Sequence, residues 1–219
     1  MYSIINENID LMLASPLLAK DIADYLRLLE GLRETDVSHN MLFQNEYRNY
    51  WKMNAARLDD TFYRAYFDLL ENSRQDYELN IEHIVETLSR AHRKKGLQFS
   101  FASKLIHMIK PHKPIYDSFV ASFYFYTPLP KTPQRRNEND DQYFDRDLNT
   151  RLTFFREFYD YLINEYTRII EYNLLQPSLD RFRNRFPQCT ADNCTDERII
   201  DSLIWHFVDA VRNRQILYL

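Results

Sequence analysis

Glycine is almost absent from this chain, whose 219 residues include only Gly31 and Gly96. A phosphate-cradling loop or a dinucleotide-binding turn needs several glycines close together, because the backbone there takes positive φ or approaches the ligand closely. The sequence therefore excludes a P-loop and a dinucleotide-binding fingerprint. With few glycines and eight prolines, it favours helices separated by short breaks.

Cysteine and long apolar runs are scarce too. The two cysteines, Cys189 and Cys194, lie close together without a nearby histidine, and two thiolates do not complete a tetrahedral zinc site. We expect free thiols in a reducing compartment. No stretch approaches the roughly 18 consecutive apolar residues that span a bilayer, and the N-terminus has no basic leader. We therefore expect a cytoplasmic protein with no metal site and no membrane partner.

Apolar residues, by contrast, recur at helical spacing along nearly the whole chain, and no segment alternates as a strand would. This pattern predicts an all-α fold of about eight to nine helices in one compact domain over residues 1–219, undivided or with two lobes of about 1–95 and 96–219 around a cleft. The predicted helices span residues 16–31, 41–53, 60–73, 81–94, 97–110, 118–126, 150–172, a short segment after 177, and 195–213. Residues 127–149, with the acidic run 137–147, are predicted to form a solvated loop.

Positive charge is concentrated in one segment, although the net charge of the chain is −4. Residues 91–113 contain six Lys or Arg side chains and no Asp or Glu. The six are Arg93, Lys94, Lys95, Lys104, Lys110 and Lys113. Such a local cluster can neutralise phosphates even on an acidic protein.

Lys104 has a distinctive position in the predicted helix 97–110. On a helical wheel the polar arc carries Ser100, Ser103, His107 and Lys110, and Lys104 lies at the margin between this arc and the apolar one. An amine at that margin is partly desolvated, which lowers its pKa and makes it available as a nucleophile. The alternative is a surface lysine whose stem lies along the core and whose ammonium stays in water.

Asp117 follows a double-proline break after that helix. Pro111 and Pro114 prevent the helix from continuing, and Asp117 stands where the next helix begins. The intervening residues can retrace the length of the helix, so Lys104 and Asp117 are predicted to face each other across the turn, in a recess lined by the basic segment. Asp117 is also a favourable N-cap, and the two roles are compatible because a capping carboxylate stays ionised.

The order of these residues resembles the signature of the helix-hairpin-helix DNA glycosylases, in particular bacterial proteins with the 8-oxoguanine-glycosylase fold. The matching stretch reads Ser100-Phe101-Ala102-Ser103-Lys104, an apolar helix, and then Pro114-Ile115-Tyr116-Asp117. The C-terminal segment 197–207, ERIIDSLIWHF, is similar to the closing helix of those bacterial proteins.

The resemblance implies a glycosylase and lyase that acts on an oxidised purine rotated out of duplex DNA, without a metal or an organic cofactor. It implies that Lys104 attacks the anomeric carbon to form a Schiff base and that Asp117 stabilises the positive charge on the sugar. Contacts to the DNA backbone are expected from the nearby side chains of Ser100, Ser103, His107, Lys110, His112 and Lys113. The aromatic side chains, Phe119 and Trp205 among them, are interpreted as core packing.

Two departures from the family pattern keep other functions open. Ser100 and Ala102 stand where the family has the two glycines of its hairpin, and Asp117 follows Lys104 by 13 residues, a shorter spacing than in the best-known members. One alternative is a non-catalytic DNA-binding module on the same fold. The other is a helical interaction or defence-associated protein whose basic segment contacts a protein or RNA.

Overall fold

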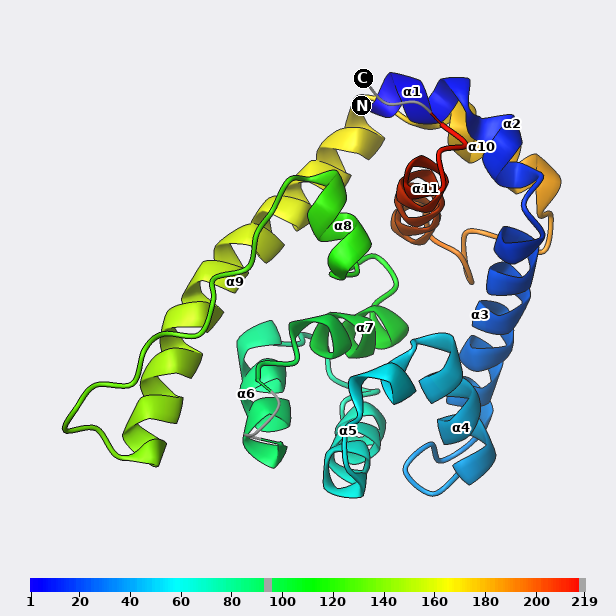
Figure 1. Cartoon of the computed structure of the whole chain (residues 1–219). Coiled ribbons are helices and arrows are strands. Elements are labelled where there is room, and N and C mark those ends of the chain that lie inside the picture. Colours follow the sequence, from blue (N-terminus) through cyan, green and yellow to red (C-terminus); the bar gives the residue numbers. More distant parts are fainter. Residues whose placement is uncertain (93–95, 217–219) are drawn as a thin grey trace.

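The protein was analysed as a computed structural model, which describes residues 1–92 and 96–216. These residues form eleven α-helices and one 3₁₀ helix and contain no strand, which confirms the predicted all-α fold (Figure 1). The helices are α1 (Tyr2–Glu7), α2 (Ile9–Leu13), α3 (Pro16–Glu34), α4 (Met41–Tyr50), η1 (Met53–Ala56), α5 (Asp60–Asn72), α6 (Ile81–Ala91), α7 (Phe99–Ile109), α8 (Ser118–Phe123), α9 (Asp140–Glu171), α10 (Gln176–Arg185) and α11 (Asp196–Arg212). Within the described ranges, every helix is too short or too polar to cross a membrane.

Side-chain caps fix where many of these helices begin. Six described helices start after a residue whose side-chain oxygen accepts a backbone N–H of the first turn, which satisfies a donor that has no partner inside the helix. The caps are Asn40, Asp59, Asn80, Asp117, Asn139 and Thr195. The predicted helix starts at residues 41, 60, 81 and 118 are confirmed.

Helix α9 differs from its prediction, because it begins at Asp140 rather than at residue 150. Asn139 and Gln142 form a reciprocal capping box, and Asp140 and Asp141 place negative charge at the positive end of the helix dipole. The acidic run is therefore mostly helical and not a solvated loop. The short helices α1 and α2 were not predicted either, since five or six residues are too few to reveal a helical period.

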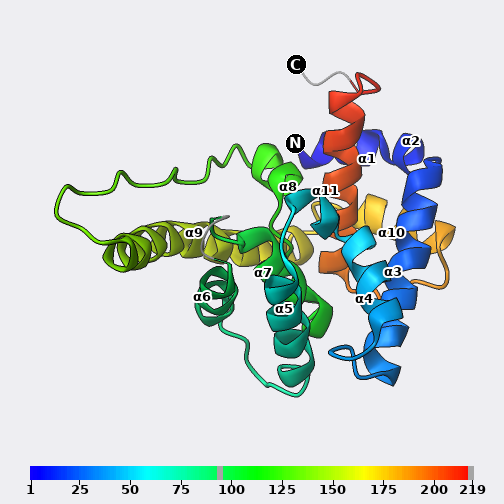
Figure 2. The ribbon, with the colours of Figure 1, turned by 60° about the horizontal axis from the view of Figure 1, so that its bottom comes forward.

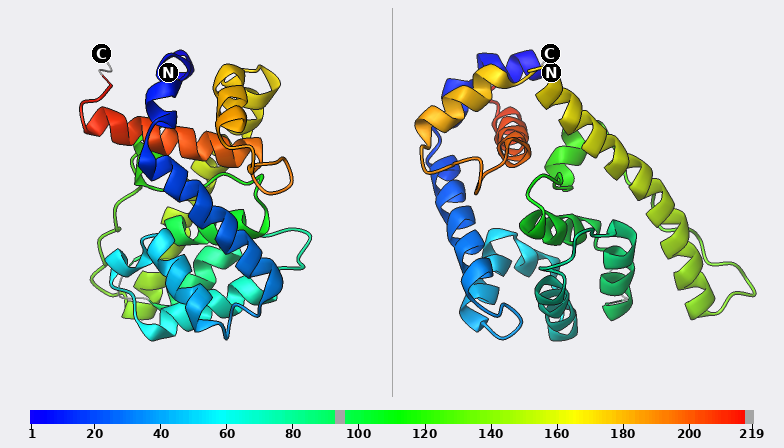
Figure 3. Two further views of the ribbon diagram at one scale, coloured as in Figure 1. Left: turned by 90° about the vertical axis from the view of Figure 1, so that its right-hand side faces the viewer. Right: turned by 180° about the vertical axis from the view of Figure 1, so that it is seen from behind.

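Helix α7 lies at the centre of the molecule, with α8 above it and α4, α5 and α6 below it in Figure 1. Helix α9 runs along one side and α3 along the other, and the view from behind in Figure 3 shows the same frame. Helices α1 and α2 pack against α10 and α11, so the two ends of the chain form one group. The N-terminal end of α9 and the loop before it extend away from the other helices (Figure 2).

Aromatic contacts anchor α7 from two sides. Phe99 stacks on Phe155 of α9 with ring centroids 4.1 Å apart. On the opposite side the Tyr66 hydroxyl of α5 donates to the Phe101 carbonyl at 3.1 Å, and it is 2.9 Å from the Tyr47 hydroxyl of α4. Buried aromatic pairs and satisfied hydroxyls of this kind hold a helix in one position, which matters because α7 carries Lys104.

Candidate functional site

Two of the four side chains in the predicted polar arc of α7 face the protein interior. Ser103 and His107 are both 0% exposed. Ser103 Oγ accepts from the Tyr116 N–H at 2.9 Å, and His107 Nδ1 donates to the Lys113 carbonyl at 2.7 Å. The expectation that these two side chains contact DNA phosphates is therefore wrong, because both meet backbone groups of the protein instead of water.

His107 is held as a neutral imidazole. A carbonyl oxygen can only accept, so Nδ1 carries the proton and Nε2 accepts from the Tyr25 hydroxyl, 3.2 Å away. Burial, with the nearby charge of Arg198 as a smaller cause, lowers the pKa of His107 to about 3. His107 is therefore uncharged at neutral pH.

The Lys104 amine is buried, with only 8% of the residue exposed. Its Nζ donates to Ser100 Oγ at 3.1 Å and lies 5.5 Å from the ring of Trp51 and 5.6 Å from that of Phe101. Loss of hydration lowers the pKa of Lys104, and the negative charge of Asp117 partly opposes this effect. A larger fraction of this amine is neutral, and thus nucleophilic, than of a surface lysine.

Asp117 is the N-cap of α8, as its sequence position predicts. Its Oδ1 accepts from the backbone N–H groups of Phe119 at 2.8 Å and Val120 at 3.0 Å. Both bonds use Oδ1, so the cap does not involve the other oxygen, Oδ2. The cap fixes the direction of the carboxylate while leaving an oxygen for a ligand or for the amine.

Lys104 and Asp117 line one cleft of about 840 Å³. Its walls come from α3, the end of α4, the first turns of α7, the start of α8 and one face of α11. The double-proline turn thus brings the two side chains to the same cleft. The volume lies in the range of about 300–1,000 Å³ that small-ligand sites occupy.

Acidic and basic side chains line this cleft in equal numbers. The basic side chains are Lys20, Arg27, Lys52, Lys104 and Arg198, and the acidic ones are Asp21, Asp24, Glu46, Asp117 and Asp201. Some of them form ion pairs, such as Arg27 with Asp24 at 2.9 Å and with Glu46 at 3.2 Å. The predicted recess lined by the basic segment therefore differs from the cleft, where basic side chains do not outnumber acidic ones.

Of the basic side chains in the basic segment, Lys104 alone is in the described lining of the cleft. Lys110, His112 and Lys113 lie on the loop after the C-terminal end of α7, with His112 exposed and the two lysines partly exposed. Lys104, by contrast, lies in the middle of the helix and lines the cleft. The remaining members, Arg93, Lys94 and Lys95, fall outside the described residues.

Helix α11 supplies a row of cleft residues that sequence reasoning missed. These are Arg198, Asp201, Ser202, Trp205 and His206. Their spacing of three and four places them on one face of the helix, and polar residues at that spacing inside an apolar segment were the available signal. The resemblance of segment 197–207 to a closing helix did not single out any of them.

Two buried donors of α11 lack a partner among the described residues. Arg198 Nη2 donates to Asp21 at 2.9 Å and to the Tyr50 hydroxyl at 2.6 Å, but its Nε has no partner within the part of the chain that is described. Ser202 Oγ has none there either. Since buried polar atoms are nearly always paired, a hydrogen-bond acceptor at this wall of the cleft would satisfy them.

Asp201 is almost completely buried in the same helix, and burial raises its pKa to about 8. The Tyr166 hydroxyl donates to Asp201 Oδ1 at 2.7 Å, and the Ile115 N–H lies 3.2 and 3.3 Å from its two oxygens. These donors, together with Arg198, oppose the shift but are weaker than desolvation. A substantial fraction of Asp201 is therefore protonated at neutral pH.

Phe119 and Trp205 form an aromatic wall of the cleft. Their rings stack at 4.6 Å with an angle of 26°, and the Arg212 guanidinium lies 4.2 Å from the centre of the Phe119 ring. Both aromatic side chains are partly exposed and line the cleft. Their interpretation as core packing is therefore incomplete, because they also offer a flat surface to a ligand.

Comparison of the chain with protein-family models, with curated proteins and with solved structures finds no match in any of the three. In the described ranges, no three or more His, Cys, Asp or Glu side chains are grouped so that they could hold a metal ion. The functional interpretation thus depends on the residues of the cleft.

Proposed function

We propose that the protein is a DNA glycosylase with lyase activity that removes an oxidised purine from duplex DNA. The observation that carries the proposal is the buried Lys104 amine, with its lowered pKa, in the same cleft as the carboxylate of Asp117. This combination suits an amine nucleophile that attacks a carbon on which positive charge develops. The cleft is large enough for a nucleotide rotated out of the helix.

In the proposed reaction the neutral Lys104 amine attacks the anomeric carbon of the sugar. The bond from that carbon to the base breaks, and the base leaves with the bonding electrons and takes up a proton. Asp117 stabilises the positive charge on the sugar and accepts the proton that the amine loses. Opening of the sugar ring gives a Schiff base, from which the 3′ phosphate is eliminated.

Other cleft residues support an oxidised purine as the ligand. The stacked pair of Phe119 and Trp205 offers an aromatic face for a base. Arg198 Nε and Ser202 Oγ are donors that an oxo group of the base would satisfy. Ser100 at the cleft, and Lys110, His112 and Lys113 outside it, are proposed to contact the DNA backbone.

The test is to incubate the protein with duplex DNA that contains 8-oxoguanine in the presence of borohydride, which reduces a Schiff base to a stable amine. We expect a covalent adduct from the wild type and none from Lys104→Gln. The matched control is Lys52→Gln, which removes an exposed lysine from the same cleft and is expected to leave the adduct unchanged.

An absence of adduct from the folded wild type with several lesions would overturn the enzyme proposal. If binding to duplex DNA then survives Lys104→Gln, the result supports a non-catalytic DNA-binding module on the same fold.

The balanced charge of the cleft favours a second candidate, a helical interaction protein whose partner is a protein. Equal numbers of acidic and basic side chains suit a partner with charges of both signs better than they suit a polyanion. The dependence of DNA affinity on salt separates the two, because neutralising several phosphates gives a steep fall of affinity with salt. A flat dependence, together with no adduct, supports the second candidate.

A further inference from the structure

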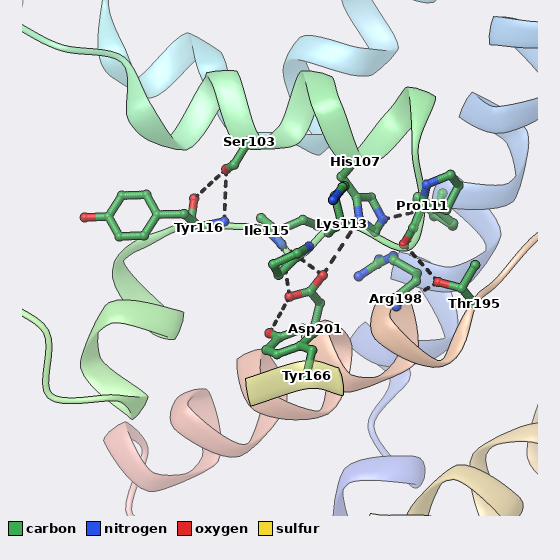
Figure 4. Close-up of polar contacts among 12 residues, drawn as sticks. Ser103, His107, Pro111, Lys113, Ile115, Tyr116, Tyr166, Thr195, Arg198 and Asp201 are labelled. Atoms are coloured by element: carbon green, nitrogen blue, oxygen red, sulfur yellow. Dashed lines mark hydrogen bonds and ion pairs between the residues drawn. The ribbon is translucent and has the colours of Figure 1, made fainter. Parts of the chain in front are cut away.

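The chain segment that leads into Asp117 is held by side chains rather than by secondary structure. Residues 114–116 belong to no helix, yet a backbone group of each one, and of Lys113 before them, is bonded to a buried side chain. Figure 4 shows several of these bonds converging on the segment from α7 on one side and from α11 on the other.

Two of the bonds come from the side chains of α7. Ser103 Oγ accepts from the Tyr116 N–H at 2.9 Å and lies 3.2 Å from the Tyr116 carbonyl, and His107 Nδ1 donates to the Lys113 carbonyl at 2.7 Å (Figure 4). Ser103 precedes Lys104 directly in the helix. The residue that holds the backbone next to Asp117 is thus covalently joined to the residue that carries the amine.

The other bonds come from α11 and α9. Asp201 accepts from the Ile115 N–H, and the Tyr159 hydroxyl donates to the Pro114 carbonyl at 3.0 Å. Ser103, His107, Asp201 and Tyr159 are all less than 5% exposed. A buried polar side chain destabilises the fold unless it is hydrogen-bonded. Here four buried polar side chains each bond a backbone group of one residue in the segment 113–116, so the segment and the four side chains depend on each other for their position.

We infer that Ser103 and Tyr159, together with Asp201 and His107, are positioning residues that hold Asp117 in its place in the cleft that also contains the Lys104 amine. The inference rests on the proposed function and assigns these side chains a role in its chemistry without contact to DNA. Rates of reactions between positioned groups depend steeply on distance, and a misplacement of about 1 Å can cost roughly 10²-fold. Side chains that fix the backbone on both sides of the turn limit such a displacement.

The first test uses Tyr159→Phe, which removes one hydrogen bond, and Ser103→Ala, which removes the bonds of the Ser103 hydroxyl to Tyr116 and to the Ser100 carbonyl. We expect each to lower the rate of borohydride-trapped adduct formation at saturating abasic-site DNA by about tenfold or more, with DNA affinity unchanged. The matched control is Tyr63→Phe, which removes a buried hydroxyl that donates to the Met53 carbonyl at 3.2 Å, away from the segment. We expect no loss of rate from the control.

A purely structural role is separated by repeating both substitutions in the Asp117→Asn background. Residues that act through Asp117 lose their effect there, so Ser103→Ala and Tyr159→Phe should slow the residual reaction by less than about twofold. Equal losses in both backgrounds, or no loss in either, would overturn the inference. Tyr159→Phe, which only deletes a hydroxyl, keeps the test valid if Ser103→Ala fails to fold.

The second test does not depend on activity and reports the Lys104 pKa by NMR of lysine side chains, with Lys104→Gln to assign the signal. Asp117 raises this pKa, so Asp117→Asn lowers it. If the segment positions Asp117, Ser103→Ala and Tyr159→Phe also lower it, and Tyr63→Phe does not. An unchanged pKa in the first two would overturn the inference. A wild type without adduct whose Lys104 pKa still responds in this way would contradict only the proposed function.

Discussion

The middle and the C-terminal end of helix α7 carry lysines in opposite surroundings. Lys104 lies in the middle of the helix, close to two aromatic rings, with a lowered pKa. Lys110 is the C-cap, partly exposed, where water and the negative end of the helix dipole both stabilise an ammonium. The surroundings, rather than the count of basic residues, decide which lysine is able to act as a nucleophile.

The same contrast holds for the polar neighbours of the two lysines. Around the first, Asp117, Asp201 and His107 are bonded inside the protein, and the last two have shifted pKa values. Around the second, His112 is exposed on a surface loop. The comparison predicts that changes around Lys104 alter the chemistry and the stability, and that changes around Lys110 alter only the affinity for an anionic partner.

The largest effect is expected from Asp117→Asn. Asparagine retains the N-cap, so the fold is expected to persist, but the charge that stabilises the sugar cation is lost. We expect the rate of adduct formation to fall by roughly 10²-fold. The matched control is Asp59→Asn, which changes another aspartate N-cap, that of α5, and should leave the rate within about twofold of wild type. Comparable losses in both variants would show that the effect is structural.

The pH dependence of stability is the next largest effect. The pKa of Asp201 is raised in the folded protein, so the folded state binds its proton more tightly than the unfolded state. The stability that Asp201 contributes is complete below its ordinary pKa and is lost as the pH rises towards about 8. From about pH 6.5 to about pH 8 we expect a loss of about 1 to 2 kcal/mol in the free energy of unfolding.

Chemical denaturation of the wild type and of Asp201→Asn checks this dependence. The variant cannot ionise, so its stability should not show the decline. An ordinary histidine pKa lies near 6.5 and that of His107 is lowered to about 3, so His107 makes the protein slightly more stable as the pH rises above 6.5 and does not account for a decline. Parallel curves for the two proteins would contradict the expectation.

A smaller effect on stability is expected from removing each lysine charge. Lys104→Met replaces a desolvated amine by an apolar side chain of similar length, and we expect the free energy of unfolding to rise by about 1 kcal/mol while the adduct is lost. Lys110→Met should change stability by less than about 0.5 kcal/mol. Denaturant melts of both variants provide the comparison. A clear loss of stability in Lys104→Met would show that the amine contributes more to the fold than its burial costs.

The smallest effect is expected at the C-terminal end of α7. The double variant Lys110→Ala with Lys113→Ala should bind DNA several-fold more weakly, and the slope of log affinity against log salt should fall by about 0.9 for each phosphate contact that is lost. Adduct formation at saturating DNA should not change. A loss of rate at saturating DNA would contradict the prediction that the side chains around Lys110 affect only binding.

Much of the helical frame could be predicted from the sequence, because its signals are local. Asn40, Asp59 and Asn80 mark helix starts through a bond to their own first turn, and the apolar period identifies the helices that follow. The start of α9 was missed because an acidic run was interpreted only as solvated charge. Its capping box was a local signal as well.

The residues of the candidate site also fall into two groups, those that local sequence signals identify and those whose place depends on tertiary packing. Lys104 and Asp117 could be identified because a helix, two prolines and a cap relate them within a short stretch. Arg198 and Ser202 could not, since their place in the cleft depends on how α11 packs against helices from the other end of the chain. Ser103 and His107 were assigned to the surface because a helical wheel shows which side of a helix is polar but not whether that side faces water.

The sequence by itself determined that the chain is helical, where most helices begin, and that an amine and a carboxylate lie on either side of a proline-marked turn. Only the tertiary structure decided that Ser103 and His107 of α7 are internal, that acidic and basic side chains line the cleft in equal numbers, and that side chains from α9 and α11 hold the turn. The physical reason is the range, along the chain, over which each kind of interaction acts. Capping and helical periodicity act over a few residues, whereas burial and the pKa values that follow from it depend on every element that packs around a side chain.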